Sequence, residues 1–518
     1  MLSMTQPTLS PAQVWSKRAF VGLLYFISFY LVFTIYLQGE ILFALLALVV
    51  VTSGIYIFSN QKTYRWRYLY PGVAAIGIFV VFPLLCTVVI AFTNYSGTNQ
   101  LSYEQVLKQL QSQRYSAGEK FDFKLFDAGN GQYQLAFSHP TSQKNYLSEP
   151  LAVENLAGDV TVKESESLPT SAVVPLKVIT QNRTKLQGIT VELPTGESLS
   201  MSGLRQFAEL KPRYQFDESK QELTNMESGK TYRPNDDIGF FQLVDAQGNF
   251  VGERLEPGYT VVTGWQNFVK IVTDKGVQGP FIKIFIWTVT FAFLTVIFTT
   301  LLGMIFASLV QWEPLKGKAT YRLLLILPYA VPGFISILVF KGLFNQSFGE
   351  INLILNNLFG IRPEWFNDPT LAKIMLLIVN TWLGYPYIMI VCMGFLKAIP
   401  QDLYEASAID GATVWQNFTR ITMPLLIKPL MPLMIASFAF NFNNFVLIQL
   451  LTVGGPNMVG TTTPAGHTDL LVSYTYRIAF EGSGTQDFGL AAAISVIIFL
   501  LVSALALFQI RLTKLSNE

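Results

Sequence analysis

Long apolar runs recur along this chain, and they constrain its fold more than any other feature. An α-helix needs about 20 predominantly apolar residues to cross the hydrocarbon core of a bilayer. The chain is 51% hydrophobic and only 14% charged over 518 residues, which excludes an ordinary soluble enzyme. The runs predict an α-helical polytopic membrane protein with eight spans, at about residues 20–37, 41–58, 70–92, 284–310, 323–340, 374–396, 430–453 and 488–510. The first run lacks a small-x-small cleavage site and leads almost directly into the second, so it is expected to be a retained anchor.

Lys and Arg are distributed unequally between the short connections. Connections rich in these residues face the cytoplasm. One set carries most of them, namely Lys17, Arg18, Lys62, Arg65, Arg67, Lys316, Lys318, Arg322, Lys397, Arg420, Lys428, Arg511 and Lys514. The opposite short connections carry only Arg362 and Arg477, although Lys283, Lys341 and Lys373 lie near the outer helix ends. Both termini are therefore predicted to be cytoplasmic.

A polar insertion separates the third and fourth runs and is long enough to form a soluble domain. Apolar and polar residues alternate on both sides of a Gly-Asn-Gly turn at residues 129–131, as in a β-hairpin. The sequence predicts three spans within residues 1–92, a mainly β external domain at 93–279, and a five-span core at 280–518 with a cytoplasmic loop at 397–428. Docking of an external partner is the expected role of the insertion.

No catalytic or metal-binding pattern is evident. His139 is isolated in the insertion, where an exposed turn residue is the expected interpretation. Cys86 and Cys392 lie inside apolar runs, as small buried hydrophobic residues do. Residues 229–231, Gly-Lys-Thr, resemble the end of a phosphate loop, but Thr224 stands where its first glycine is needed. The chain is therefore expected not to be an enzyme, to bind no ATP itself and to hold no metal.

Uncharged polar residues gather in the later spans. Ser437, Asn441 and Asn444 follow at i, i+4 and i+7 and share one predicted helix face, with Phe440 beside them and Asn443 on a different face. Proline and glycine mark broken helices of the kind that line transport pathways. The fifth and sixth spans contain Pro328, Tyr329, Pro332, Gly333, Asn380, Gly384, Tyr385, Pro386 and Tyr387. Helix–helix adhesion explains any one of these residues, but the cluster around Asn441 favours a site for a neutral, hydroxyl-rich ligand such as a sugar.

A polar stretch at residues 403–424 interrupts two long apolar segments and predicts two short helices hinged at a glycine. Gly411 suits a left-handed C-terminal cap. Thr413 and Gln416 form a capping-box pattern for the second helix, which Pro424 is expected to end. We expect a partner outside this chain to bind the hinged pair of helices.

This stretch resembles the EAA loop of binding-protein-dependent ABC importer permeases. The family form is Glu-Ala-Ala, three residues, Gly, nine residues and Ile-x-Leu-Pro. The chain departs from it at Ser407, where the family has alanine, and at Met423, where it has leucine. The matching positions for contact with an ATPase are Glu405, Ala406, Ser407, Gly411, Ile421 and Pro424. The number of spans and the external insertion extend the resemblance over essentially the whole chain.

The resemblance implies the membrane-spanning permease subunit of a sugar importer that works by alternating access in a bacterial inner membrane. ATP and Mg²⁺ would be bound by a separate ATPase, so this chain needs no cofactor. The implied partners are a smaller permease subunit, two copies of the ATPase and a periplasmic sugar-binding protein, with no nucleic acid. The family's pathway positions correspond to Gly384, Tyr387, Ser437, Phe440, Asn441 and Asn444.

Two other functions remain open from the residues. An ion-coupled secondary sugar carrier is disfavoured because no predicted span contains an internal Asp, Glu or His, although sodium coupling through backbone carbonyls would leave no such trace. A non-transporting membrane receptor or scaffold is disfavoured by the broken, polar spans.

Overall fold

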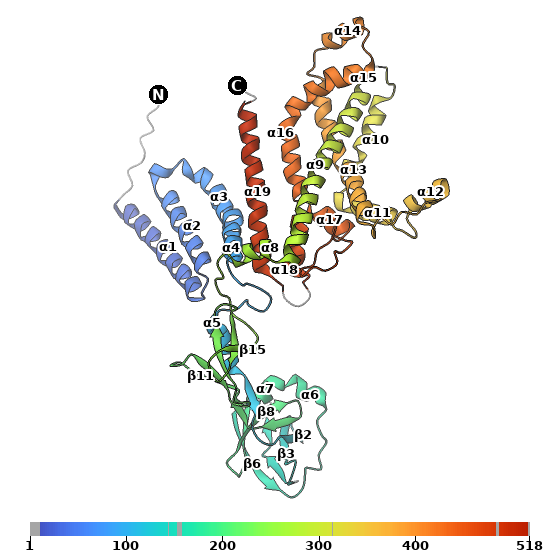
Figure 1. Cartoon of the computed structure of the whole chain (residues 1–518). Coiled ribbons are helices and arrows are strands. Elements are labelled where there is room, and N and C mark those ends of the chain that lie inside the picture. The colour runs from blue at the N-terminus through green and yellow to red at the C-terminus, as the bar shows by residue number, and fades with distance from the viewer. Residues whose placement is uncertain (1–10, 143, 153–157, 313, 483–485, 516–518) are drawn as a thin grey trace. The chain divides into compact units, whose positions relative to one another are not determined.

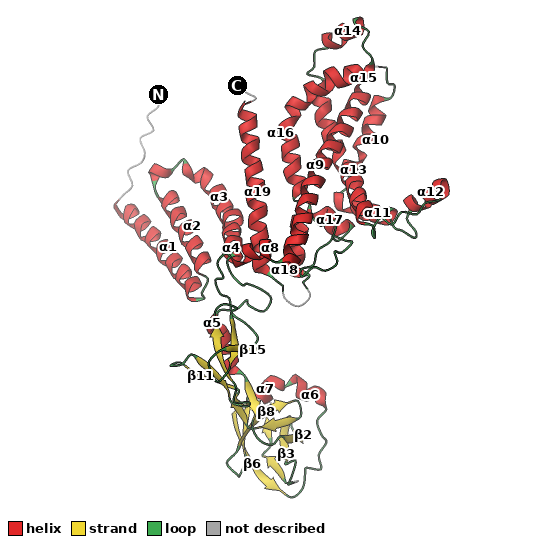
Figure 2. Ribbon diagram, viewed as in Figure 1, coloured by secondary structure: helices red, strands yellow, loops and turns green. Residues whose placement is uncertain are grey.

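The structure, a computed structural model, describes residues 11–142, 144–152, 158–312, 314–482 and 486–515. The chain forms two compact units (Figure 1). The first, Met1–Gly97 with Val262–Glu518, is helical, and the second, Thr98–Val261, is rich in strands (Figure 2). A strand-rich domain is thus inserted between the N-terminal helices and the later helices, as the sequence predicts.

Seven helical segments of the described chain are long and apolar enough to cross a membrane, and a bent helix pair makes an eighth candidate. The third of them contains a π turn at Gly77–Val81, which joins two α-helices. The helices of these segments are α1 (Pro11–Leu37), α2 (Ile41–Ser59), α3 (Trp66–Ile76), α4 (Phe82–Ala91), α9 (Lys275–Gln311), α10 (Lys318–Ala330), α11 (Gly333–Leu343), α13 (Pro369–Leu396), α15 (Val414–Asn417), α16 (Met423–Phe442) and α19 (Phe488–Leu515). Shorter helices of this unit are α8 (Gln266–Thr273), α12 (Glu350–Phe359), α14 (Asp402–Ile409), α17 (Phe445–Leu451) and α18 (Leu471–Phe480).

The fifth predicted span is not one continuous helix. Helices α10 and α11 meet at an angle of 93°. Val331, the residue between α10 and Pro332, is extended, with φ −94° and ψ 131°. The ring of a proline disfavours the helical conformation of the residue before it, so Val331 ends α10. The break confirms the broken helix that Pro332 and Gly333 predict for the fifth span.

The seventh predicted span also has a different course. It was expected to run from residue 430 to 453, but α16 ends at Phe442 and a separate short helix, α17, follows. Asn443 leaves the helical conformation, with φ −108° and ψ 25°, and Asn444 caps α17. The apolar run therefore contains two helices, because asparagine side chains compete for backbone groups and favour caps.

Helices α9 and α13 pack side by side along the helical unit (Figure 1). A Cβ atom at Gly303 would lie 2.8 Å from Ile388 Cγ2 and 3.0 Å from the backbone nitrogen of Met389. A Cβ atom at Gly384 would lie 2.8 Å from Thr299 Cγ2. Small residues allow helices in membranes to approach closely. The two glycines therefore permit the tight contact between α9 and α13.

Gly303→Ala is expected to weaken the helical unit. The added methyl group meets the backbone of α13, and overpacking of this kind costs about 1–3 kcal/mol. Thermal unfolding of the purified protein in detergent measures the change. Gly394→Ala on α13 is the matched control, because a Cβ there meets nothing within 4 Å. Equal stability of the two variants would contradict this account of the packing.

The inserted unit contains an eight-stranded sheet, a five-stranded sheet and a two-stranded sheet. The predicted hairpin is confirmed: β2 (Phe121–Gly129) pairs antiparallel with β3 (Gln132–Ser138), and Phe123 lies opposite Phe137. Pairing of β2 with β3 also closes the larger sheet, whose order is β2-β9-β8-β7-β6-β4-β3-β5. The inward side chains of these strands form the main core of this unit.

Most of the other strands of the inserted unit are short. Those of the eight-stranded sheet are β4 (Asn145–Ser148), β5 (Leu151–Ala152), β6 (Gly158–Ser165), β7 (Ile189–Glu192), β8 (Ser198–Gly203) and β9 (Gln206–Ala208). The five-stranded sheet runs in chain order from β11 (Tyr214–Asp217) through β12 (Glu222–Asn225), β13 (Thr231–Asn235) and β14 (Phe240–Val244) to β15 (Phe250–Arg254). The remaining elements are α5 (Tyr103–Ser112), α6 (Leu176–Gln181), α7 (Arg183–Gln187), β1 (Arg114–Ser116) and β10 (Leu210–Pro212).

The Gly-Lys-Thr sequence at residues 229–231 lies at the turn between β12 and β13. Its lysine, Lys230, pairs with Glu253 on β15 at 2.6 Å. A phosphate loop needs a helix N-terminus whose backbone N–H groups face the phosphates. This hairpin has none, so the sequence match carries no nucleotide site.

Candidate substrate cavity and coupling loop

A cavity of about 820 Å³ lies among α9, α10, α11, α13, α16 and α17. No residue lining it is charged among those the structure describes. The structure brings all six predicted pathway residues to its wall, together with polar and aromatic side chains from other helices. These lining residues are Thr295, Thr299, Tyr329, Asn380, Gly384, Tyr387, Ser437, Phe440, Asn441 and Asn444.

Three asparagine side chains form a continuous hydrogen-bond chain in the wall of the cavity. Asn380 Nδ2 donates to Asn441 Oδ1 at 2.7 Å, and Asn444 Nδ2 donates to Asn380 Oδ1 at 3.2 Å. Asn441 Nδ2 in turn donates to the backbone oxygen of Ser437 at 2.8 Å. Asn380 and Asn441 are only 6% and 5% exposed, so these bonds are protected from water. The bonds fix the orientation of each amide, as a binding site requires.

Asn444 reaches this chain by a different route from the one the sequence predicts. The prediction placed it on the same helix face as Ser437 and Asn441, but α16 ends before it. Its Oδ1 instead accepts the backbone N–H of Leu447 and caps α17. The predicted shared helix face is wrong, because the break at Asn443 starts a new helix. All three side chains nevertheless line the same cavity.

Aromatic rings cover part of the same cavity. Phe440 is 73% exposed, and Tyr387 is 43% exposed. The rings of Tyr329 and Tyr387 are stacked, with centroids 6.4 Å apart and an interplanar angle of 24°. Asn443 lies next in sequence to the cavity residues but outside the cavity, and its Nδ2 donates to the Ala439 carbonyl at 3.4 Å.

The combination of aromatic faces and uncharged amides suits one class of ligand. Amides exchange hydrogen bonds with hydroxyl groups, and flat aromatic faces pack against apolar ring faces. A charged ligand would find no opposite charge on the lining residues. The cavity can therefore take a neutral, hydroxyl-rich molecule of the size of a small oligosaccharide.

The loop at residues 397–428, called the coupling loop below because its motif resembles the EAA loop, adopts the two hinged helices that its sequence predicts. Helix α14 ends before Gly411, whose φ of 75° lies in the left-handed region. The capping box is confirmed, since Thr413 Oγ1 accepts from the Gln416 backbone N–H and Gln416 Oε1 accepts from the Thr413 N–H. Glu405 is exposed on α14. The loop thus presents a capped helix whose acidic side chain is available to another protein.

The end of the second helix was predicted wrongly. Pro424 does not end it, because α15 continues through a π turn at Phe418–Thr422 into α16. Proline lacks an N–H and its ring crowds the preceding turn. The wider π turn directly before Pro424 supplies space for the ring, so the helical segment runs from Val414 to Phe442. The coupling loop is therefore joined to the cavity by one continuous segment.

One contact between α14 and this segment was not predicted from the sequence. The hydroxyl groups of Tyr404 and Thr422 are hydrogen-bonded at 2.9 Å. Thr422 is only 5% exposed, so water competes little for the bond. Tyr404 lies next to Glu405 on α14, and Thr422 belongs to the π turn that leads into α16. The bond therefore fixes α14 to the segment that leads to the cavity.

Tyr404→Phe and Thr422→Val are each expected to lower the amount of substrate moved per ATP hydrolysed by about threefold. One neutral hydrogen bond contributes about 0.5–1.5 kcal/mol. Its loss weakens the attachment of α14 to the segment that leads to the cavity, without removing a surface side chain. Uptake and ATP hydrolysis are measured in the same proteoliposomes with the partner subunits. Thr419→Val is the control, because Thr419 Oγ1 donates to the Trp415 carbonyl of its own helix at 2.8 Å. An unchanged ratio in both test variants would refute the role of this bond.

A helical membrane bundle with a broken span, an uncharged cavity and a hinged pair of short helices is typical of a transport permease. Among the described residues, no group of three or more His, Cys, Asp or Glu side chains is arranged to hold a metal ion. Family models agree with this class. The binding-protein-dependent transport system inner membrane component matches residues 299–514, the MalF N-terminal transmembrane region matches 15–62, and the MalF P2 domain of maltose transport permeases matches 101–264.

Relatives match over nearly the full length. The maltose/maltodextrin transport system permease protein MalF of Klebsiella aerogenes is 59% identical over 98% of this chain and 98% of its own length. The protein of the same name from Escherichia coli strain K12 is 58% identical over the same shares. A solved bacterial alginate ABC transporter is 22% identical, covering 48% of this chain and 81% of its own, with a TM-score of 0.40. This chain belongs to the MalF family of binding-protein-dependent permeases, and it is a transport component, not an enzyme.

Proposed function

We propose that this chain carries maltose and maltodextrins inward across the bacterial inner membrane by alternating access. The single observation that carries the proposal is the uncharged cavity lined by amides and aromatic rings. Its chemistry suits a neutral sugar, and relatives at 58–59% identity are named for maltose and maltodextrin transport. Gly384, Tyr387, Ser437, Phe440, Asn441 and Asn444 are the proposed pathway residues.

The energy enters at the coupling loop in this proposal. A cytoplasmic ATPase grips α14 at Glu405, Ala406 and Ser407, and Gly411 allows the helix pair to turn. Ile421 and Pro424 belong to the segment that continues into α16, where Ser437, Phe440 and Asn441 lie. A push on α14 is carried along this segment because a helix resists shortening along its axis. The sugar site is thereby opened to one side of the membrane and closed to the other.

The partners follow from the same scheme. A smaller permease subunit would complete the pathway, and two ATPase subunits would act on the two permeases. A periplasmic sugar-binding protein would deliver the sugar, with Thr98–Val261 as its docking domain. Both termini and α14 would face the cytoplasm.

Reconstitution of the chain with these partners in proteoliposomes tests the proposal. Uptake of radiolabelled maltose is expected only when the binding protein is outside and ATP is supplied to the ATPase subunits. Uptake by this chain alone along an ion gradient would favour a secondary carrier instead. Binding of the external protein without any flux would favour a receptor. Comparison of maltose, longer maltodextrins and sucrose defines the substrate range.

Phe440→Ala is expected to lower maltose uptake at limiting sugar by about three- to tenfold, since an aromatic face contributes about 0.5–1.5 kcal/mol beyond its buried area. The side chain is 73% exposed, so its removal leaves little packing defect and assembly should persist. Initial uptake rates in proteoliposomes give the measurement. Phe293→Ala on α9 is the matched control, because Phe293 is 56% exposed and lies outside the cavity. Full uptake by Phe440→Ala would show that this ring has no role in the pathway.

A further inference from the structure

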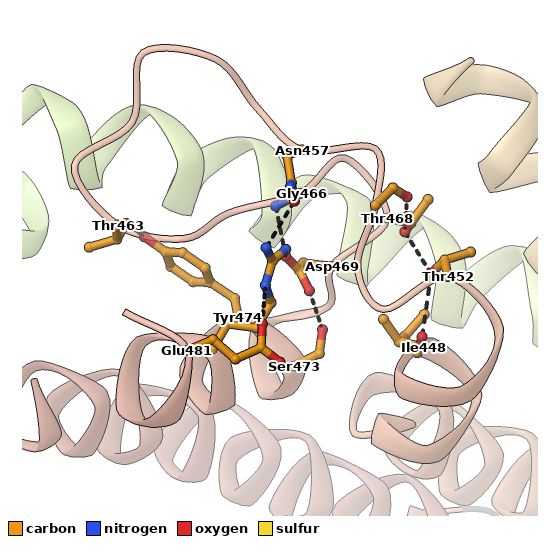
Figure 3. A network of polar contacts seen from close by, with 12 residues as sticks. Ile448, Thr452, Asn457, Thr463, Gly466, Thr468, Asp469, Ser473, Tyr474 and Glu481 are labelled. Carbon is orange, nitrogen blue, oxygen red and sulfur yellow. Dashed lines mark hydrogen bonds and ion pairs between the residues drawn. The ribbon is translucent and has the colours of Figure 1, made fainter. Parts of the chain in front are cut away.

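A buried ion pair lies beyond the C-terminal end of α17. Asn444 is at the N-terminal end of the same helix. Arg477 Nη1 donates to Asp469 Oδ2 at 2.8 Å, and the two side chains are 8% and 0% exposed (Figure 3). Arg477 is on α18, and Asp469 is near the end of the loop that connects α17 with α18. Counted by sequence alone, Arg477 is one of few basic residues in the outer connections. Its burial shows that it acts within the fold and not on the surface.

The ion pair joins distant points of this loop. Asp469 Oδ2 also accepts the Gly466 N–H at 2.7 Å, and Asp469 Oδ1 accepts the Ser473 hydroxyl at 2.8 Å. Arg477 Nη2 donates to Asn457 Oδ1 at 2.8 Å. Buried charges that are paired and fully hydrogen-bonded favour one geometry over alternatives that leave a charge unpaired. The loop is therefore held in a single arrangement.

The backbone of the loop is equally constrained. Gly454 has a φ of 77°, and a Cβ there would lie 2.2 Å from Asp469 Oδ1. A Cβ at Gly466 would lie 1.9 Å from the Gly454 carbonyl oxygen. Only glycine permits this approach, and glycine adopts the left-handed conformation at position 454 without strain. The carboxylate is thus enclosed by backbone.

A second set of contacts connects the loop to α17. The Thr468 hydroxyl lies 2.8 Å from Thr452 Oγ1 and 2.6 Å from the Gly455 carbonyl oxygen (Figure 3). The Thr452 and Val453 N–H groups both donate to the Ile448 carbonyl, which closes the end of α17. Thr468 is 0% exposed and adjoins Asp469 in sequence. The ion pair and the end of α17 are therefore parts of one polar network.

The loop is also attached to α9. The indole N–H of Trp287 donates to the Thr468 carbonyl at 3.4 Å, and Thr288 Oγ1 accepts the Leu471 N–H at 3.0 Å. Helix α9 lines the cavity further along, at Thr295 and Thr299. The network therefore braces α17 against a helix that itself forms the cavity wall.

We propose that the Asp469–Arg477 pair positions the Asn444 amide in the cavity by bracing α17 at its far end. Helix α17 is short and begins at Asn444, which caps it and donates to Asn380. Movement of its far end would displace the cap, because the helix moves as one body. Among the described residues, neither Asp469 nor Arg477 lines the cavity, so they are positioning residues. The inference rests on the proposed function, because it assigns Asn444 to sugar binding.

The test uses the complete complex in proteoliposomes and the initial uptake of radiolabelled maltose at limiting concentration. The double variant Asp469→Leu with Arg477→Met removes both buried charges together, so neither is left buried and unpaired. Glu481, which also pairs with Arg477 at 3.0 Å, is 33% exposed and stays in contact with solvent. Thr468→Val breaks the link to α17 and leaves the ion pair in place. The double variant and Thr468→Val are each made in three backgrounds, which are the wild-type chain, Asn444→Ala and Asn443→Ala. Co-purification of the partner subunits reports assembly.

A brace that acts through Asn444 predicts strongly non-additive effects. We expect the double variant, Thr468→Val and Asn444→Ala each to lower uptake by about fivefold, since misplaced binding groups lose much of their effect. In the Asn444→Ala background, the brace variants should lower uptake less than about 1.5-fold further, as coupled residues do. In the Asn443→Ala background, their full effect should remain.

Different results would contradict the inference and the assignment of Asn444 to the pathway. Additive effects, or normal uptake by both brace variants, would overturn the inference and leave the proposed function intact. Normal uptake by Asn444→Ala would overturn the assignment of that residue to the pathway, and the inference with it. If the double variant does not assemble, the uptake of Thr468→Val in the same backgrounds decides whether the inference holds. Failure of both to assemble would overturn the inference, because it would show a purely structural role.

Discussion

Glu405→Lys is expected to lower maltose uptake by the reconstituted complex by about 100-fold, the size of effect produced when a charge at the centre of an interface is reversed. Glu405 is exposed on α14 and takes part in no ion pair among the described residues. Its charge lies in the first turn, where it also complements the positive end of the helix. That local contribution is under about 1 kcal/mol, so α14 should still form. The loss should therefore come from the contact with the ATPase.

Uptake and maltose-stimulated ATP hydrolysis measure the effect, and membrane insertion is followed by the yield of the purified chain. Asp410→Lys is the matched control. Asp410 is an exposed acidic residue at the C-terminal end of the same helix, where a positive charge suits the dipole. We expect that variant to retain most of its activity. Normal uptake by Glu405→Lys would exclude α14 as the site where the ATPase acts.

Asn441→Leu is expected to lower maltose uptake by at least about tenfold, since leaving a buried polar group without its partner costs about 1–3 kcal/mol. Asn441 Oδ1 accepts from Asn380, and its Nδ2 donates to the Ser437 carbonyl. Leucine has a similar volume but offers neither group. The Asn380 amide would lose its orientation, and the sugar would lose a hydrogen-bonding partner in the cavity.

Initial uptake rates and co-purification of the partners distinguish a lost site from lost assembly, because Asn441 is buried. Asn443→Leu makes the same chemical change two residues later, at an exposed side chain outside the cavity. It is expected to transport normally. Equal uptake by the two variants, with both assembled, would refute the proposed site around Asn441.

Features that depend on neighbouring residues were predictable from the sequence. Apolar runs gave the membrane spans, because the bilayer requires length and hydrophobicity alone. The turn after Gly411 and the capping box at Thr413 and Gln416 are made by residues at most three or four apart. The hairpin of β2 and β3 follows from alternation about a glycine turn. In each case a short segment contains both partners of the interaction.

Predictions failed where a distant or competing interaction changed a local preference. Pro424 was expected to end a helix, but the π turn before it admits the proline ring. Asn444 was expected on the face of α16, but its side chain caps α17 instead. Both residues carry ambiguous local signals. Proline is compatible with a first helical turn as well as with a helix end, and asparagine with a helix face as well as with a cap.

The membrane spans and the residue types around the cavity follow from composition and order along the sequence. The contacts between Asn380 and Asn441, between Tyr404 and Thr422, and between Asp469 and Arg477 do not. Each depends on which helices pack together and on which polar group loses water when they do. Hydrophobic burial selects the segments that enter the membrane, whereas the need to satisfy buried polar groups selects their partners. A buried polar group can pair only with groups that folding brings within hydrogen-bonding distance, so these partners depend on the tertiary structure.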